Sequence, residues 1–452
     1  MSTTRAFGSC LPDVRVRPPG PDSRALAERL ARVESRNITF LTDDWPVFWE
    51  EAVGSNVRDA DGNVYLDLTS AFGVSLLGHA PPPVLKALST QVRLIHGMGD
   101  IHPPVQKLEL LEALADIAPW TETRTILAGS GSEAVEAALK TARLASNRPG
   151  ILAFQGGYHG LTLGSLAATE RHHFRRGFEE RLFEGVAFAP FPDPVRDGDS
   201  DGSGALDVVR GLLRDGAPNG DPIGTVIVEP VQARGGCRVP PAGFLRELGR
   251  LAREAGALVV ADEIFTGLGR CGALFASEAA GLDADLICVG KALGGGLPIS
   301  ACIGPPSVMD AWPPSDGEAI HTSTFLGHPL ACAAAVEVID ELRKGAVLDR
   351  ASRVGEQLRL GLAAALGSHP AVAEVRGVGP LLGIDLVEDD GRTPREGAGA
   401  QVARRALAEG LILLPAGDDG HVVELTPPMT LDDAQVDFVL ETLPRVVREV
   451  VS

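Results

Sequence analysis

The chain has 452 residues, of which 44% are hydrophobic and 22% charged, a composition typical of globular proteins that contain more than one domain. Its formal net charge of -19 at pH 7 argues against binding to nucleic acid or to an anionic membrane, because both require a basic surface. The N-terminus lacks the apolar core of a signal peptide and no run is long enough to span a bilayer, so we expect a cytoplasmic protein that acts on small molecules.

Helix and strand patterns follow one another along the chain. The first hundred residues predict a helix over 23–33 and a hairpin over 56–68 that turns at Asp61-Gly62. From about residue 125, short apolar runs alternate with amphipathic segments at 132–147 and 241–254. The runs expected to form strands are 124–129, 150–154, 185–190, 224–230, 256–264, 284–290 and 299–304. This order predicts an α/β fold with a mostly parallel sheet covered by helices on both faces.

The last third of the chain has a different pattern. Long helical patterns at 329–343, 348–366, 397–409 and 431–447 surround short strands in AVAEVRG, PLLGIDLV and HVVELTP, which predicts a smaller α+β domain. Two polar stretches, DPVRDGDSDGSG and RDGAPNGDPIG, are predicted to be surface excursions. We therefore expect three parts: an N-terminal segment (1–65) joining the smaller domain, a large α/β domain (66–334), and a smaller C-terminal domain (335–452).

The six cysteines form no CxxC pair, and several lie in apolar runs, where cysteine behaves as a small hydrophobic residue. We expect reduced thiols, with neither a bound metal nor disulfides.

Lys291 is the most informative single residue. It follows the strand-like run DLICVG and precedes ALGGGLP, at the edge of an α/β sheet where ligands bind. A buried lysine has a lowered pKa and can attack a carbonyl as a neutral amine, forming a Schiff base. A surface lysine with a snorkelling side chain would give the same local pattern.

Two further strand ends carry polar groups. The run GALVVA ends in Asp262 and Glu263, where a buried carboxylate needs a cationic partner such as a protonated cofactor ring; a helix-capping or loop carboxylate is the alternative. After RTILAG, Ser130 and Glu133 predict a capping box at a helix start, whose free N–H groups also suit a phosphate.

Two glycine patterns match nucleotide-binding motifs only in part. GLGRCG matches the dinucleotide fingerprint GxGxxG, but five residues separate it from the strand and ALFASE does not open a helix. VGKALGGG lacks the Ser/Thr and the upstream glycine of a P-loop, so the sequence does not support binding of a nucleoside triphosphate.

The ordered set AGSGSEAVEAALKTAR, FQGGYHG, VEPVQARGG, VVADEIFTGLGRCG, ICVGKALGGGLPIS and TSTFLGHPLACAAA resembles the class III pyridoxal-phosphate aminotransferases, the relatives of ornithine, acetylornithine and 4-aminobutyrate aminotransferases. The likeness extends from about residue 57 to the end of the chain. It implies the fold type I architecture, in which a large sheet domain is joined by a smaller domain built from both termini. It also implies the cofactor pyridoxal 5'-phosphate (PLP) and a homodimer with shared active sites.

The resemblance assigns roles to matching residues. It implies that Lys291 is the Schiff-base lysine, which also moves the substrate proton, and that Asp262 keeps the pyridine nitrogen protonated. The remaining residues that it places at the cofactor are Gly131 and Ser132 on the phosphate, Thr324 on the phosphate of the neighbouring subunit, Tyr158 and Ile264 on the two ring faces, His159 nearby and Glu229 lining the site. Arg376 matches an arginine that binds a substrate carboxylate.

Two positions depart from the family pattern. Arg234 stands where relatives acting on ornithine or 4-aminobutyrate usually have a glutamate that pairs with the substrate-binding arginine. If both Arg376 and Arg234 face the pocket, their repulsion favours strongly anionic substrates or requires another acid; alternatively, Arg234 points outward. Phe265 stands where many relatives have a glutamine that binds the cofactor's phenolic oxygen. The phenylalanine removes that donor and enlarges the apolar wall of the site.

These observations predict an aminotransferase that works in two half-reactions, from an amine donor to a keto acid, aldehyde or ketone acceptor. The departures suggest an unusual amine, for example an amino sugar or a secondary-metabolite intermediate. A 2,1-aminomutase or a decarboxylating transaminase of the same fold is the alternative. A cofactor-sensing transcription regulator is disfavoured, because too few residues precede the hairpin for a DNA-binding domain and the charge is acidic.

Overall fold

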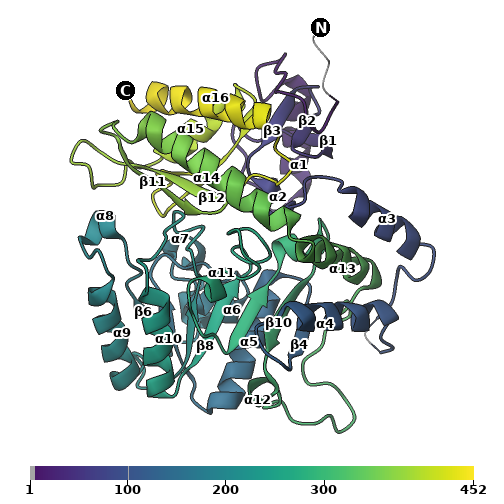
Figure 1. Ribbon diagram of the computed structural model, residues 1–452, viewed down its shortest axis with the longest axis vertical. Helices are drawn as coiled ribbons and strands as arrows, with labels where there is room; N and C mark the ends of the chain where they lie inside the picture. The colour runs from purple at the N-terminus through teal and green to yellow at the C-terminus, as the bar shows by residue number, and fades with distance from the viewer. Residues whose placement is uncertain (1–5, 100) are drawn as a thin grey trace.

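A seven-stranded sheet forms the centre of the computed structural model, which describes residues 6–99 and 101–452 (Figure 1). The strand order is β4-β10-β9-β8-β7-β5-β6, and only β10 runs antiparallel to its neighbours. The strands are β4 (Arg124–Ala128), β5 (Gly150–Phe154), β6 (Val186–Ala189), β7 (Ile223–Val228), β8 (Leu258–Glu263), β9 (Leu286–Val289) and β10 (Ser300–Gly304). The predicted mostly parallel sheet is confirmed.

Helices cover both faces of this sheet, which is why its strands are continuous apolar runs. One face packs against α5 (Gly131–Ser146), α6 (Leu163–Ala168) and α12 (Pro306–Met309). The other face is covered by α4 (Val105–Ile117), α9 (Ser203–Asp215), α10 (Phe244–Ala255) and α13 (Pro329–Arg343), with α3 (Pro82–Gln91) against α13. Short segments complete this region: α7 (His172–Arg175), α8 (Pro194–Asp197), α11 (Ala276–Ala279), and the 3-10 turns η1 (Glu179–Arg181) and η2 (Lys291–Gly294).

A second core lies beside the first, at the top of Figure 1. Its antiparallel sheet has the order β11-β12-β15-β14 and packs against α14 (Ala346–Leu366), α15 (Ala398–Leu407) and α16 (Asp433–Val451). The strands are β11 (Val372–Val378), β12 (Leu381–Leu386), β14 (Leu414–Ala416) and β15 (Val422–Leu425).

The N-terminal strands join this second region. β1 (Trp49–Val53), β2 (Asn56–Asp59) and β3 (Val64–Asp67) form a sheet with β13 (Leu411–Ile412), which pairs with β3 in parallel. The chain before them contributes α1 (Pro21–Val33), and after them follows the short turn α2 (Ser70–Gly73). Residues 1–5 of the predicted N-terminal segment lie outside the described residues. The predicted boundary at 335 falls inside α13, which packs on the larger core as far as Leu342, and the three-part division stays a prediction.

The predicted strands and long helices all form, with ends that differ by a few residues. Strands β1, β13 and β14 were not predicted: β1 and β14 pair with the strand that follows each of them, whereas the two residues of β13 pair with the distant β3. The two polar stretches were predicted to be surface excursions, and this is wrong for Asp193 in the first and for Ile223, which lies in the buried strand β7, in the second. Asp193 is buried, because Arg196 and Arg238 draw it into an ion-pair network.

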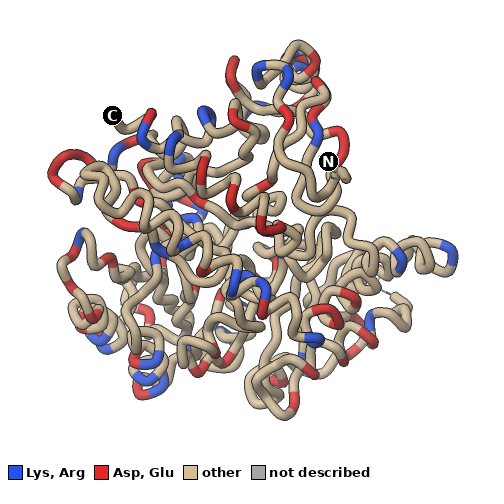
Figure 2. Tube along the Cα trace, turned by 45° about the horizontal axis from the view of Figure 1, so that its top comes forward, with Lys and Arg blue, Asp and Glu red and all other residues tan. Residues whose placement is uncertain are grey.

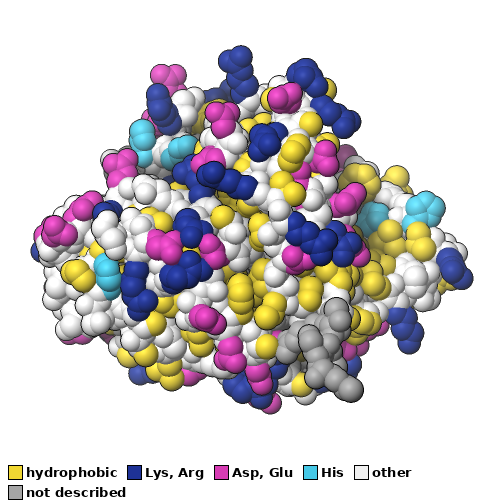
Figure 3. All heavy atoms as spheres, turned by 90° about the horizontal axis from the view of Figure 1, so that it is seen from above, with side chains coloured by type: hydrophobic (Ala, Val, Ile, Leu, Met, Phe, Trp, Pro, Cys, Tyr) yellow, Lys and Arg dark blue, Asp and Glu magenta, His cyan; other side chains and the backbone are white. Residues whose placement is uncertain are grey.

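Charged residues of both signs are distributed along the chain (Figure 2), and their side chains are intermixed on the face seen from above (Figure 3). No helix within residues 6–99 and 101–452 combines the length and the apolar character needed to cross a bilayer.

Candidate active site

Three neighbouring strands of the large sheet end at the same cavity. Glu229 follows β7, Asp262 lies near the end of β8, and Lys291 follows β9 by two residues. The cavity has a volume of about 190 Å³. It is lined by Phe72, Ser130, Gly131, Ser132, Tyr158, His159, Gly160, Glu229, Arg234, Asp262, Ile264, Phe265 and Lys291. The carboxyl edge of a parallel sheet is the expected place for a ligand, because loops diverge there.

Lys291 enters the cavity from a strained backbone and between two aromatic rings. Its φ of +42° lies in the left-handed region. Its amine nitrogen lies 4.2 Å from the centroid of the Phe265 ring and 5.4 Å from that of Phe72. Burial among these groups lowers the pKa of Lys291 to about 8, although Asp262 and Glu229 oppose the shift. The amine is therefore neutral in part of the molecules near neutral pH and can act as a nucleophile.

Phe72 reaches the cavity through an unusual turn. Ser70, Ala71 and Phe72 all have positive φ values of 49°, 49° and 65°, which L-residues adopt only where the surroundings hold them. Asp67 and the backbone of Thr426 hold this turn by accepting hydrogen bonds from Ala71 N (2.8 Å) and from Ser70 Oγ (2.6 Å). Phe72 could not be predicted from the sequence, because its place at the cavity depends on this turn.

Asp262 is held by a histidine. Asp262 Oδ2 lies 2.7 Å from His159 Nδ1, and Asp262 Oδ1 accepts from the backbone N–H of Ile264 at 3.1 Å. Burial opposes protonation of His159, but the contact with Asp262 prevails and raises the pKa of His159 above its ordinary value. The pair fixes a carboxylate on the cavity wall, where it can hold a proton on a ligand. His159, placed only near the cofactor by the resemblance, thus contacts the acid itself.

The N-terminus of α5 also lines the cavity. The Ser130 hydroxyl accepts from Glu133 N at 3.3 Å, while the Glu133 carboxylate accepts from Gly129 N at 2.7 Å. The predicted reciprocal capping box is therefore wrong in one half, because the glutamate bonds one residue before the cap. Gly131 and Ser132 open the helix, where backbone N–H groups lack helical partners and suit an anion.

Glycines let neighbouring groups approach this wall closely. A Cβ on Gly160 would lie 2.3 Å from Ser132 Oγ, and a Cβ on Gly131 would lie 2.9 Å from Ile264 Cγ2. Ser132 Oγ accepts from Leu161 N at 3.0 Å, which ties the loop after β5 to the helix start.

Glu229 and Tyr158 meet at the side of the cavity. Tyr158 N donates to Glu229 Oε1 at 2.9 Å, and the Tyr158 ring packs edge-on against Phe174 at 5.3 Å between centroids. Burial raises the pKa of Glu229 to about 7, so this carboxyl group can gain and lose a proton near neutral pH. Thr324 lies outside the cavity, on an exposed segment.

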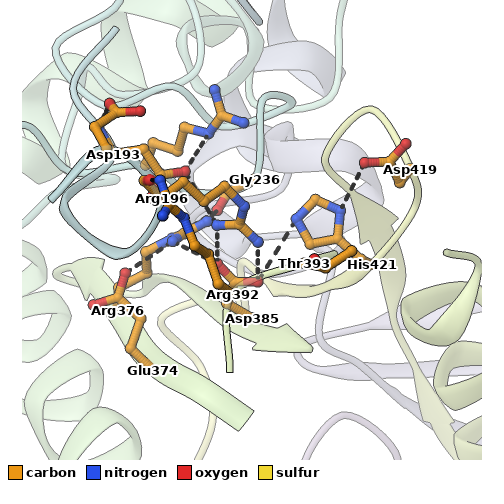
Figure 4. Close-up of polar contacts among 12 residues, drawn as sticks. Asp193, Arg196, Gly236, Glu374, Arg376, Asp385, Arg392, Thr393, Asp419 and His421 are labelled. Carbon is orange, nitrogen blue, oxygen red and sulfur yellow. Dashed lines mark hydrogen bonds and ion pairs between the residues drawn. The ribbon is translucent and has the colours of Figure 1, made fainter. Parts of the chain in front are cut away.

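Arg376 does not line the cavity. Its guanidinium donates to Gly236 O at 2.8 and 3.0 Å, and to Asp385 and Glu374 at 2.8 Å each. Figure 4 shows this network, in which Asp385 also receives two bonds from Arg196 of the large domain. Each of its side-chain nitrogens is thus engaged by protein, and the structure gives no support to the expected contact with a substrate carboxylate.

Arg234 does line the cavity, and it brings a partner that the sequence analysis missed. Arg234 Nη1 donates to Glu424 Oε2 at 3.2 Å and to Pro415 O at 2.9 Å. Arg234 thus faces the cavity and does not point outward, but Arg376 does not line the cavity with it, so neither predicted alternative matches in full. A single glutamate inside the apolar strand HVVELTP was the available signal for Glu424, since a buried charge in a strand requires a partner.

A sequence model described as aminotransferase class-III matches residues 41–447. The chain belongs to the class III aminotransferase family. The enzyme is 35% identical to the 4-aminobutyrate aminotransferase of Escherichia coli over 88% of this chain and 92% of that protein. It is 32% identical to an alanine/serine racemase of Pyrococcus horikoshii over 98% of this chain and 94% of that protein. An omega transaminase of Pseudomonas jessenii, solved in complex with PMP, superposes with a TM-score of 0.85 at 25% identity, covering 94% of this chain and 98% of that one.

The enzyme is therefore an aminotransferase that depends on PLP, with the fold type I architecture predicted from its motifs. The chemistry of the cavity fits this cofactor. The amine of Lys291, with its lowered pKa, suits the aldehyde, and the buried carboxylate of Asp262 suits the ring nitrogen. The N-terminus of α5 suits the phosphate.

Proposed function

We propose that this aminotransferase moves an amino group from a donor amine to a carbonyl acceptor in two half-reactions, with Lys291 as its central base. The observation that carries the proposal is the convergence of Lys291, Asp262 and Glu229 from adjacent strands on one cavity. PLP supplies an aldehyde that condenses with amines and a protonated ring that accepts electrons from the substrate carbon. The residues of the chain bind that group, orient it and move the proton.

Lys291 would hold the cofactor through its aldehyde and later carry the substrate proton, for which a pKa of about 8 is well placed. Asp262 would keep the ring nitrogen protonated, and His159 would hold Asp262 in position through the 2.7 Å contact. Tyr158 and Ile264 would flank the ring.

Gly131 and Ser132 would bind the phosphate at the start of α5. Thr324, exposed in the single chain, would complete the phosphate site of a second subunit in a homodimer. Measurement of the mass in solution tests the dimer, and Thr324→Ala should weaken cofactor binding only if that dimer forms.

Reduction of the loaded enzyme with borohydride, followed by peptide mapping, tests the role of Lys291. We expect the cofactor to be fixed to the peptide that contains Lys291, with Lys140 as an internal control lysine. An unmodified Lys291 in fully loaded enzyme would refute the proposal.

A second experiment separates amino transfer from chemistry that returns the cofactor unchanged. The loaded enzyme is mixed with a panel of single amines without any acceptor, and released pyridoxamine phosphate is measured by chromatography. Amino transfer leaves the amino group on the cofactor, in proportion to the enzyme. A 2,1-aminomutase, or a racemase like the Pyrococcus relative, would convert the amine without that accumulation, and a decarboxylating transaminase would also release carbon dioxide.

A further inference from the structure

Arg234 is clamped in place by the smaller domain. Its backbone oxygen accepts from Gly417 N at 3.0 Å, and its Nη1 donates both to Pro415 O and to Glu424. Its guanidinium also lies over the Phe72 ring, with Cζ 5.2 Å from the centroid. These contacts fix a long side chain that would otherwise lose entropy on binding a ligand, so Arg234 is preorganised at the cavity.

One edge of the Arg234 guanidinium is left for a ligand. Both of its side-chain hydrogen bonds use Nη1, and within the described part of the chain Nε and Nη2 have no hydrogen-bond partner. This pair of donors is a planar fork that matches the two oxygens of a carboxylate. Arg234 Cζ and Lys291 Nζ lie 5.2 and 5.4 Å from the centroid of the same Phe72 ring. A carboxylate bound at Arg234 would therefore belong to a molecule that reaches Lys291.

Glu424 is the charge that balances Arg234. Its side chain is 1% exposed and comes from β15 of the smaller domain. Arg234 Nη1 donates a hydrogen bond to Glu424 Oε2, whereas Glu424 Oε1 is buried with no hydrogen-bond partner among the described residues. A buried carboxylate so weakly satisfied is costly, and its nearest compensation is the cation that it holds. Without Glu424, the positive charge of Arg234 would act on the cavity undiminished.

We propose that Glu424 is a positioning residue that determines specificity: it holds Arg234 by Nη1 and offsets its charge, so that the free edge of Arg234 binds a single carboxylate on the donor or acceptor. This assignment rests on the proposed amino-transfer function and names its substrate class, an amine or carbonyl compound that carries a carboxylate. It also moves the expected carboxylate contact from Arg376 to Arg234.

The test measures binding as well as turnover, with glutarate and its uncharged analogue glutaramide as probes of the loaded enzyme in isothermal titration calorimetry. Glu424→Gln keeps an acceptor for Arg234 but removes the negative charge, so glutarate should bind roughly tenfold more tightly while glutaramide is unaffected. Arg234→Met should abolish glutarate binding. The matched control is Glu374→Gln, which removes a carboxylate from the Arg376 network outside the cavity and should leave glutarate binding unchanged.

Kinetics give a second readout. With a carboxylate-bearing donor, Glu424→Gln should lower KM and leave kcat nearly unchanged, and with an uncharged amine it should change neither. Unchanged or weaker glutarate binding in Glu424→Gln, or wild-type binding in Arg234→Met, would overturn the proposal. If Glu424→Gln does not fold, Arg234→Met, which replaces a half-buried side chain, decides the outcome alone. Glutarate binding needs no turnover, so loss of the amino-transfer hypothesis and loss of this one are separate results.

Discussion

Replacing Lys291 by methionine should stabilise the cofactor-free protein. The folded protein lowers the pKa of Lys291 from 10.5 to about 8, mainly by burial. At about 1.4 kcal/mol per pH unit, this shift corresponds to a penalty of about 3 kcal/mol when the amine is protonated. Because the side chain is only half-buried, water at the cavity offsets part of this penalty, and we expect a gain of about 2 kcal/mol for Lys291→Met at pH 7. Methionine is an unbranched residue of similar length, so the packing between the two phenylalanine rings is retained.

The sign of the pH dependence makes this prediction specific. Below pH 8 the amine is protonated in both the folded and the unfolded protein, so the penalty is complete. Between pH 8 and 10.5 the folded protein has released the proton while the unfolded chain still binds it, so the penalty disappears as pH rises. Urea unfolding of wild-type and Lys291→Met proteins at pH 7 and pH 10.5 measures this. A gain equal at both pH values, or no gain at pH 7, would refute the account of Lys291.

Glu229→Gln should show the opposite pH dependence. The pKa of Glu229 rises from 4.5 to about 7, so its burial costs stability above pH 7, and the substitution should gain up to about 3 kcal/mol there and nothing below pH 4.5, measured by urea unfolding. Gly160→Ala should weaken cofactor binding by about 1–3 kcal/mol in an equilibrium titration, since the added Cβ would meet Ser132 Oγ and the φ of +127° is unfavourable for alanine. Asp385→Ala should destabilise the fold by about 3–5 kcal/mol in urea, because it leaves Arg196 and Arg376 without their buried partner; a loss below 1 kcal/mol would contradict the network.

The parts of the site that lie next to strand ends could be predicted from the sequence. Apolar runs identify the buried strands, and in a parallel sheet consecutive strands present their carboxyl ends at one edge. The residues after those runs, among them Asp262 and Lys291, were therefore expected together, and the structure brings both to the cavity. The start of α5 was readable for the same reason, since a capping residue follows directly after a strand.

The arginines could not be assigned in this way. Arg376 and Arg234 both stand near apolar strands, and a guanidinium reaches several ångströms in any direction that packing allows. Arg376 donates its hydrogen bonds to Asp385 and to the backbone oxygen of Gly236, which lies 140 residues earlier. Arg234 is held by Glu424, which is 190 residues distant.

Sequence alone thus determined the fold class and the residues at the strand ends, because burial and local hydrogen bonding leave a periodic pattern in the chain. The family was indicated by the resemblance of its ordered motifs. The tertiary structure decided which arginine faces the cavity and which acid offsets its charge. Those pairings arise only when the two domains pack together, and no local pattern records a partner on another domain.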